Sequence, residues 1–418
     1  MAFGGLLLFV GLLPVQTSVR VPVLGSSSVA VFPGDLALGA SLFAYSVGIL
    51  RGAPRPRLGS FGIAVCAYLL SMVPSVAASE SPARSGVKWS TVLVYAAAAL
   101  LAANLVDSEA GLRKVARAWL LGTAVTVVIG LGTIALFYLG TAPRLVANLT
   151  SDFGSLPPGN YPRIGALFYQ RQPNSLCHYL SISLLVICAS ASVGWVSRGV
   201  AIALGAGVLV ATAFTLSFGV GGVVLGLGWW LAWNPALRMP GLFRRGALAL
   251  GLAGAVVFVI LIVVAPTATK DQGVRLPLFS FRAERSARVV CWEGALMQFA
   301  AHPLVGRGVG LQPTCGDYVV ASGSAARLAD AHSMYLSLAS TQGLLGVAGF
   351  AGVVWTLLRR SFPLPRAATP VALMGGTLAI SFVQSCLYQG LAASLEYTRP
   401  GWVLMGLLWA TQKLQGLV

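Results

Sequence analysis

Three side chains suited to group-transfer chemistry lie at the borders of apolar segments, namely His332, Arg288 and Arg163. His332 directly precedes the apolar segment 333–358, and an ionisable group at the mouth of a membrane helix indicates a functional site. Its imidazole, with an ordinary pKa of about 6.5, can accept a proton at physiological pH. Arginine carries a permanent charge and a planar set of donors that fits phosphate oxygens. These residues predict proton abstraction beside an anionic group. In the alternative interpretation, His332 caps or packs a helix and the arginines contact lipid headgroups.

The segment 280–301 is expected to form an amphipathic helix. Arg282, Arg285 and Arg288 recur at three-residue steps, and apolar residues that include Trp292 recur on another stripe. Such a helix would lie at the membrane surface with its arginines turned toward a polar cavity. The arginines could instead meet lipid headgroups or pair with the glutamates of the same segment.

A second group of polar residues lies in an earlier connection, where Arg163 and Arg171 precede Asn174 at the start of an apolar segment. Arg163 could hold a diphosphate from the side opposite Arg288. Alternatively, Arg163 and especially Arg171 only anchor a helix end at the membrane interface.

The remaining titratable groups are less suited to catalysis. His178 lies within an apolar segment and is interpreted as a hydrogen-bonded interior residue, whereas His302 precedes Pro303 and marks a helix end. Asp35 falls inside the second apolar segment, where a carboxylate is costly to bury. Both a proton-relay role and a structural role stay open for Asp35.

The cysteines and acidic residues do not form a metal-binding pattern. The six cysteines show no CxxC spacing, and the acidic residues are scattered with no DxD pair. Neither a disulfide framework nor a zinc site is expected, and chemistry without a metal or cofactor is favoured. A single bridge between Cys291 and Cys315 remains open.

Composition assigns these residues to a membrane protein. Hydrophobic residues make up 57% of the chain and charged residues 9%, whereas soluble domains carry about 25% charge. Apolar runs of about 20 residues can cross a bilayer, and they predict an all-α polytopic integral membrane protein with about twelve transmembrane helices in one domain, residues 1–418. These helices are expected near residues 2–19, 33–50, 58–78, 88–106, 116–140, 174–194, 199–215, 217–233, 247–266, 333–358, 368–390 and 399–415.

The short basic connections predict the orientation of the chain. The arginine-rich and lysine-containing loops between alternate segments fall on one side, which the positive-inside rule makes cytoplasmic, together with both termini. The connections 141–173 and 267–331 then lie outside and are long enough to be functional. The net charge of +17 suits contact with anionic membrane lipids and is no evidence for nucleic-acid binding.

These motifs resemble those of the bacterial O-antigen ligase and polymerase superfamily. Residues 332–346 match the ligase pattern H-[NSQ]-x9-G-x-x-[GTY]. Around Arg288 and Trp292 the chain is similar to the superfamily's R-x-x-x-[LW] helix, which is followed by H-P-x-x-G-x-G at residues 302–308. Residues 163–174 are similar to its R-x-x-G-x-F segment before a P-N pair. Ligases often carry Leu where this chain has Trp292, and this departure weakens the ligase interpretation relative to a polymerase.

The resemblance implies a GT-C-like enzyme of the bacterial inner membrane with a long periplasmic loop, 267–331, that holds part of the active site. It would be an O-antigen ligase of lipopolysaccharide biosynthesis, an inverting glycosyltransferase that moves O-antigen glycan from undecaprenyl diphosphate to the lipid A-core oligosaccharide. His332 would be the general base, and Arg288 and Arg163 would stabilise the leaving diphosphate. The residues expected to contact substrate are Arg282, Arg285, Arg171, Asn174 and Trp292.

Two rival functions remain. A polymerase would use a second lipid-linked glycan as acceptor. A transporter of an anionic or lipid-linked substrate would use the same residues only for binding. Because the polar residues gather on one external face, and transporter sites usually lie near the middle of the membrane, transport is disfavoured.

Overall fold

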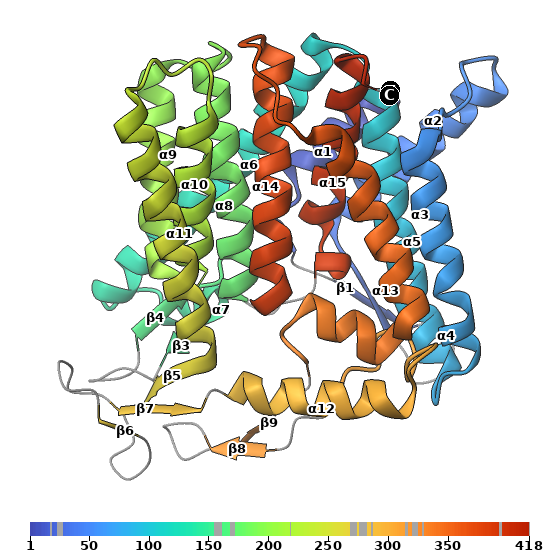
Figure 1. Ribbon diagram of the computed structural model, residues 1–418, viewed down its shortest axis with the longest axis vertical. Helices are drawn as coiled ribbons and strands as arrows, with labels where there is room; N and C mark the ends of the chain where they lie inside the picture. The colour runs from blue at the N-terminus through green and yellow to red at the C-terminus, as the bar shows by residue number, and fades with distance from the viewer. Residues whose placement is uncertain are drawn as a thin grey trace.

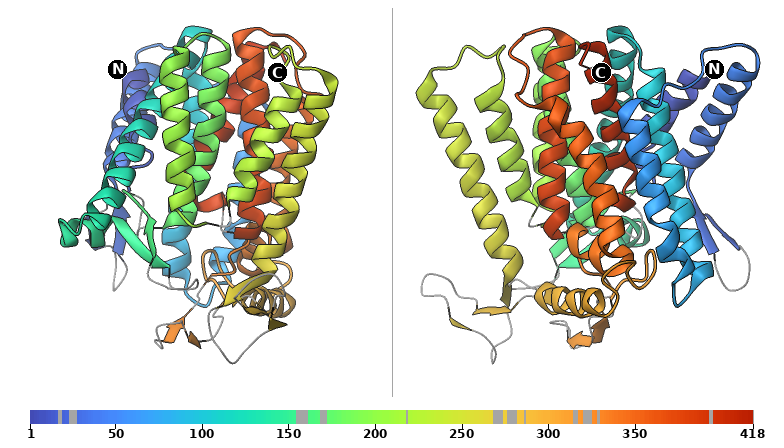
Figure 2. Two further views of the ribbon diagram at one scale, coloured as in Figure 1. Left: turned by 90° about the vertical axis from the view of Figure 1, so that its left-hand side faces the viewer. Right: turned by 45° about the vertical axis from the view of Figure 1, so that its right-hand side comes forward.

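The computed structural model in Figure 1 is a bundle of long helices with short strands and a transverse helix at its lower end. The structure describes residues 1–16, 19–22, 28–153, 161–167, 172–217, 219–267, 274–275, 282–285, 287–313, 317–319, 325–327, 330–392 and 395–417. Both termini lie at the upper end, opposite the strands (Figure 2).

Within the described residues, eight helices are long and apolar enough to cross a membrane. The chain is therefore a helical membrane protein. These helices are α2 (Pro33–Leu50), α3 (Gly59–Ser71) continued by α4 (Val73–Ala77), α5 (Pro82–Leu105), α6 (Glu109–Tyr138), α8 (Pro173–Ser192), α11 (Gly241–Val263), α13 (Met334–Ser361) and α14 (Pro370–Ala392).

The four other apolar segments form shorter helices: α1 (Ala2–Gly11), α9 (Arg198–Phe214), α10 (Val220–Trp233) and α15 (Arg399–Leu414). The expected helix over residues 2–19 is wrong in length, since α1 ends at Gly11 and Pro14 follows three residues later. Its 10 residues span about 15 Å, roughly half the hydrocarbon core. Twelve helices thus occupy the predicted segments, but eight meet the length and composition needed for a span.

Some buried polar side chains in the bundle find their partners on neighbouring helices, as Trp119 does. Trp119 of α6 stacks on Tyr179 of α8 with ring centroids 5.4 Å apart. Its indole Nε1 donates to Ser183 Oγ at 2.9 Å. Such pairing removes the cost of burying hydroxyl and indole groups away from water.

The long connections fold into short antiparallel hairpins at the lower end (Figure 1). In the first connection, α7 (Pro143–Leu149) leads into β3 (Thr150–Phe153), which pairs with β4 (Tyr161–Ile164) so that Thr150 faces Ile164. The remaining strands are β1 (Val19–Pro22) with β2 (Ser28–Val31), the sheet β5 (Val264–Thr267), β7 (Arg282–Arg285) and β6 (Val274–Arg275), and β8 (Asp317–Val319) with β9 (Ala325–Arg327).

The amphipathic helix expected over 280–301 is only partly correct. The transverse helix α12 covers Ala287–Ala301 and keeps Arg288 and Trp292. Arg282 and Arg285 instead belong to strand β7, which pairs antiparallel with β5. Backbone pairing with β5 satisfies the hydrogen bonds of this segment in an extended form, so the three arginines do not share one helical face.

Helix α13 is broken near its start, which the sequence did not predict. Gly343 has φ +64° and ψ −165° inside the helix, so residues 334–342 form a separate short helix at the lower end. The break exchanges helical hydrogen bonds for backbone bonds with residues 303–308, formed by the pairs Leu344–Pro303, Leu345–Leu304, Arg307–Ser340 and Gly308–Thr341.

Glycine is required on both sides of this contact. A Cβ atom on Gly343 would collide with the Leu304 carbonyl group, and one on Gly306, at φ +68°, would collide with the peptide between Thr341 and Gln342. Two separate sequence motifs, 302–308 and 332–346, therefore meet backbone to backbone. Their glycines permit close approach and positive φ.

Candidate functional site

The predicted site residue Arg288 and Ser333, the residue after His332, are attached to the same end of α14. The guanidinium of Arg288 donates through Nη1 to the carbonyl oxygen of Leu391 at 3.4 Å. Ser333, which directly follows His332, donates through Oγ to the carbonyl oxygen of Gly390 at 2.7 Å. Consecutive carbonyl groups of α14 thus hold α12 and the His332 segment together.

Arg163 of β4 reaches the same region from the other connection. Its Nε donates to the Thr215 carbonyl at 2.9 Å, and its Nη2 donates to Asn174 Oδ1 at 3.3 Å. Asn174, in the first turn of α8, also accepts from Ser217 Oγ at 2.9 Å. The Tyr388 hydroxyl of α14 donates to the Asn174 carbonyl at 3.1 Å. This network connects β4, α8 and the lower end of α14.

The two arginines are close enough for their charges to interact. Burial, with a further contribution from the like charge of Arg288, lowers the pKa of Arg163 to about 10. Burial also lowers the pKa of Arg288, which the charge of Asp330 opposes. Both groups remain cationic at neutral pH, and an anion between them would relieve both the desolvation and the repulsion.

His332 lies in a tight turn ahead of the short helix 334–342. Its backbone has φ +47°, and its N–H donates to Asp330 Oδ1 at 3.0 Å. A left-handed backbone is uncommon for a residue with a side chain, although His tolerates it better than most. The side chain is partly exposed. The turn therefore fixes where the imidazole leaves the backbone, at the end of α14 and beside Asp330.

Trp292 has a packing role that the sequence did not indicate. It packs with Leu391 against a small apolar cluster that contains Phe258 and Tyr388, in which the last two rings stack at 5.6 Å. Within the described part of the chain its indole Nε1 is buried without a hydrogen-bond partner. Trp292 thus belongs to the apolar packing around Tyr388.

The other predicted residues have varied outcomes. Arg171 and Cys315 lie outside the described residues. Arg282 and Arg285 lie on β7, as given above, and Asn174 contacts Arg163 directly. Cys291 is disulfide-bonded, while Cys66, Cys177, Cys188 and Cys386 are free.

The two remaining histidines behave as expected. His178 is buried, its Nε2 makes a 2.8 Å hydrogen bond with Ser385 Oγ, and its ring stacks on Tyr388. His302 directly follows the last residue of α12.

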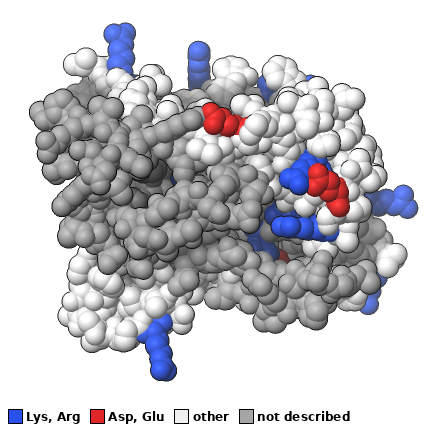
Figure 3. Space-filling model, turned by 90° about the horizontal axis from the view of Figure 1, so that it is seen from below, with Lys and Arg blue, Asp and Glu red and all other residues white. Residues whose placement is uncertain are grey.

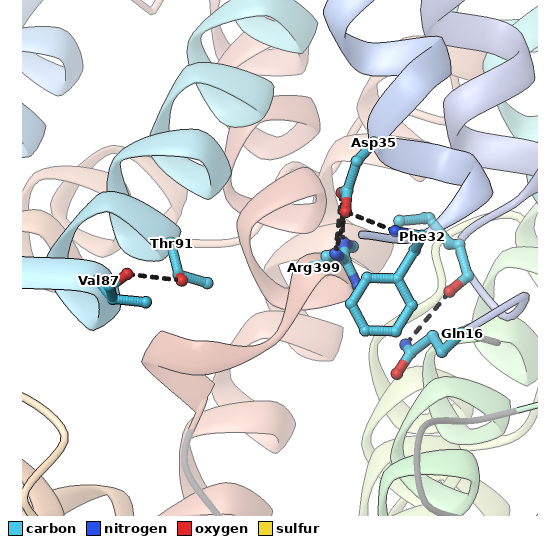
Figure 4. A network of polar contacts seen from close by, with 7 residues as sticks. Gln16, Phe32, Asp35, Val87, Thr91 and Arg399 are labelled. Atoms are coloured by element: carbon cyan, nitrogen blue, oxygen red, sulfur yellow. Dashed lines mark hydrogen bonds and ion pairs between the residues drawn. The ribbon is translucent and has the colours of Figure 1, made fainter. Parts of the chain in front are cut away.

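A second polar region, which the sequence did not predict, surrounds a cavity of about 680 Å³ between α2, α5, α8 and α15. Asp35 and Arg399 line it and form a bidentate ion pair with oxygen to nitrogen distances of 2.8 Å (Figure 4). The Arg399 guanidinium also lies 3.9 Å from the centre of the Phe32 ring. Asp35 is in the first turn of α2, where its Oδ2 accepts the Phe32 N–H at 3.0 Å. Of the two roles left open for Asp35, the structure shows a structural contact, in which a capping carboxylate pairs with an arginine.

Lys88, Gln312 and Asp330 line the same cavity. The Lys88 ammonium lies 3.9 Å from the centre of the Tyr397 ring. Gln312 Nε2 donates to Ser337 Oγ at 2.7 Å, and Ser337 in turn donates to Glu396 Oε1 at 3.1 Å. Ionisable residues in membrane helices are a functional signal by default, and that signal in Lys88 could have located this region.

The lower face also carries charges that are exposed. Viewed from below, Lys or Arg and Asp or Glu side chains lie side by side on part of this face, with charged atoms visible in a hollow beside them (Figure 3). Arg307 pairs with Glu80 at 2.6 Å, and their side chains are 37% and 54% exposed. Such a solvent-exposed pair contributes little to stability.

Neither models of known protein families nor curated protein sequences match this chain. The residues and their geometry therefore carry the functional argument.

Proposed function

We propose that this chain is a glycosyltransferase that moves a glycan from undecaprenyl diphosphate to the lipid A-core oligosaccharide, the activity of an O-antigen ligase. Arg288 and Arg163 bind the diphosphate of the donor, and His332 removes a proton from the acceptor hydroxyl. This assignment draws on the resemblance of three motifs to the ligase and polymerase superfamily and on how those motifs meet in space.

The observation that carries the proposal is the convergence of the three motifs on one end of α14. Arg288 and Ser333 bind the adjacent carbonyls of Leu391 and Gly390, and Arg163 is tied to Tyr388 through Asn174. Residues from three separate segments thus bring two guanidinium groups and the turn that carries His332 to one region. This is the set of groups that diphosphate departure and proton abstraction require.

The proposed reaction is a single displacement with inversion. The acceptor oxygen forms a bond to the anomeric carbon while the bond from that carbon to the diphosphate oxygen breaks. The electron pair of the broken bond stays on the diphosphate, where the two arginines stabilise its charge. The acceptor proton passes to the neutral imidazole of His332, a transfer typically worth about 100 to 10,000-fold in rate.

The proposal includes the membrane orientation. The end with α12 and the hairpins faces the periplasm, and the basic connections and both termini face the cytoplasm of a bacterial inner membrane. Its support is the positive-inside rule together with the location of both termini at the end away from α12 (Figure 2). The four shorter helices also cross the bilayer in this view, which gives twelve crossings.

A reconstituted transfer assay tests the function. Purified protein in liposomes is mixed with undecaprenyl-diphosphate glycan and lipid A-core, and His332→Ala is compared with wild type and with His302→Ala, an exposed histidine at the same end. We expect glycan on the lipid A-core with wild type and His302→Ala and a loss of at least about 100-fold with His332→Ala.

Three other outcomes contradict this proposal. Transfer by His332→Ala at the wild-type rate would show that His332 is not the general base. Longer lipid-linked chains in place of modified lipid A-core would identify a polymerase. Substrate movement across the liposome membrane without a new glycosidic bond would identify a transporter.

A further inference from the structure

The cavity beside the Asp35–Arg399 pair has the size and position of a second substrate site. Its volume of about 680 Å³ lies within the range of small-molecule sites, about 300 to 1,000 Å³. Asp330 lines it and also binds the backbone of His332. The cavity, which lies between α2, α5, α8 and α15, therefore adjoins the turn that carries the proposed base.

Lys88 presents a cation to this cavity. Within the part of the chain that the structure describes, its ammonium group makes a cation–π contact with Tyr397 and no hydrogen bond or ion pair. An ammonium group has three donors, so this contact leaves its donors available to a ligand. Arg399, the other cation of the cavity, is already neutralised by Asp35.

An unused acceptor lies in the same cavity. Gln312 donates through Nε2 to Ser337, while its Oε1 is buried with no partner among the described residues. A buried amide oxygen without a partner is costly, and a hydroxyl group of a ligand would satisfy it. The cavity thus offers a site for an anion and a site for a hydroxyl.

The acidic neighbours of Lys88 do not cancel its charge. Burial raises the pKa of Glu396 to about 8, with a smaller contribution from the charge of Asp330. At pH 7 this carboxyl is therefore mostly protonated and neutral. Asp330 acts on Lys88 from the adjoining loop and acts on Arg288 as well.

We propose that this cavity binds the acceptor saccharide, with Lys88 contacting a phosphate or carboxylate substituent and Gln312 contacting a sugar hydroxyl. This inference rests on the proposed transfer function and names the chemistry of its acceptor. The donor diphosphate is assigned to Arg163 and Arg288 at the end of α14. The acceptor then reaches His332 from the cavity, on the side of Asp330.

Direct binding to the full-length protein in detergent tests this site without any turnover. The probes are intact lipid A-core, lipid A-core freed of phosphate with hydrogen fluoride, lipid A-core with methylated carboxylates, and undecaprenyl-diphosphate glycan. The proteins are wild type, Lys88→Met, Lys88→Arg and the matched control Lys114→Met, which removes an exposed lysine from α6.

We expect Lys88→Met to weaken binding of intact lipid A-core by roughly tenfold or more, the usual effect of losing a charge-assisted contact. Lys88→Arg and Lys114→Met should keep the wild-type affinity. One of the two treatments, removal of phosphate or methylation of carboxylates, should weaken binding to wild type by the same factor as Lys88→Met does. That treatment should not weaken binding to Lys88→Met any further. Binding of the donor should not change in any variant.

Two results would overturn the assignment. If neither treated acceptor binds wild type more weakly than intact acceptor, Lys88 does not recognise an anion on it. If Lys88→Met loses the donor as well, Lys88 belongs to the diphosphate site. If acceptor binding does not depend on Lys88 but transfer occurs, the acceptor site is wrong and the proposed function stands. If binding depends on Lys88 but no glycosidic product forms, the proposed function is wrong and the binding site stands.

Discussion

The two polar regions of this molecule use arginine in different ways. Arg399 is held by a carboxylate, since both of its terminal contacts in the cavity go to Asp35. The hydrogen bonds described for Arg163 and Arg288 go to neutral oxygens, which belong to backbone carbonyls and to the Asn174 amide.

Arg399 has a structural role, whereas the proposed function assigns the donor diphosphate to Arg163 and Arg288. The Asp35–Arg399 pair joins α2 to α15 and carries no net charge. Arg163 and Arg288 are positioned at the end of α14 by contacts that include these neutral oxygens. The short helix 334–342 connects the regions, because Ser333 binds Gly390 at one end and Ser337 binds Glu396 further along.

The largest effect that tests the comparison is expected from Arg288→Ala. Loss of one positioned donor to a developing negative charge typically costs about 100 to 1,000-fold in rate, and we expect transfer to fall by this amount with the amount of folded protein unchanged. The assay is initial-rate transfer per folded molecule in liposomes. Arg307→Ala is the matched control, because that arginine pairs with an exposed glutamate at the same end. Equal losses in both variants would mean that transfer depends on the total positive charge of this end and not on the position of Arg288.

A smaller effect, on stability, is expected from Asp35→Asn. The Arg399 side chain is 7% exposed, and breaking a buried pair leaves its charge uncompensated at a cost of about 3 kcal/mol. The measurement is denaturant unfolding in detergent. The double variant Asp35→Asn with Arg399→Met should recover part of the loss. If the double variant is less stable than Asp35→Asn alone, Arg399 has a stabilising role beyond its pairing with Asp35.

The sequence predicted the region of Arg163, Arg288 and His332 better than the cavity. The reason is how far apart in sequence the residues that define each region lie. His332, Arg288 and Arg163 each stand within a local pattern that a single segment displays. Asp35 and Arg399 are 364 positions apart, and neither lies in a motif. Their pairing depends on how α2 packs against α15, which local patterns do not encode.

Local periodicity also failed where backbone pairing decided the structure. The three-residue spacing of Arg282, Arg285 and Arg288 predicted one helix, yet pairing with β5 made the first two part of a strand. The apolar run after His332 predicted one continuous helix. Gly343 interrupts it because the backbone of residues 303–308 replaces the lost helical hydrogen bonds, and that partner lies in another segment.

The smallest expected effect is a pH dependence that belongs to the cavity region alone. Burial raises the pKa of Glu396 from 4.5 to about 8. Between these values the folded protein holds a proton that the unfolded chain releases, so stability falls as pH rises, by up to about 1.4 kcal/mol per pH unit. Glu396→Gln keeps the shape and removes the titration, and its unfolding free energy should therefore fall less than that of wild type from about pH 5 to pH 8.

The matched control is Glu80→Gln, because the Arg307 contact lowers the pKa of Glu80 and its titration lies below this window. Glu80→Gln should follow the wild-type curve. The measurement is denaturant unfolding at several pH values in the same detergent. Parallel curves for wild type and Glu396→Gln would mean that the carboxyl is ionised in the folded protein, and the charge of Lys88 would then be balanced by Glu396 and not held for a ligand.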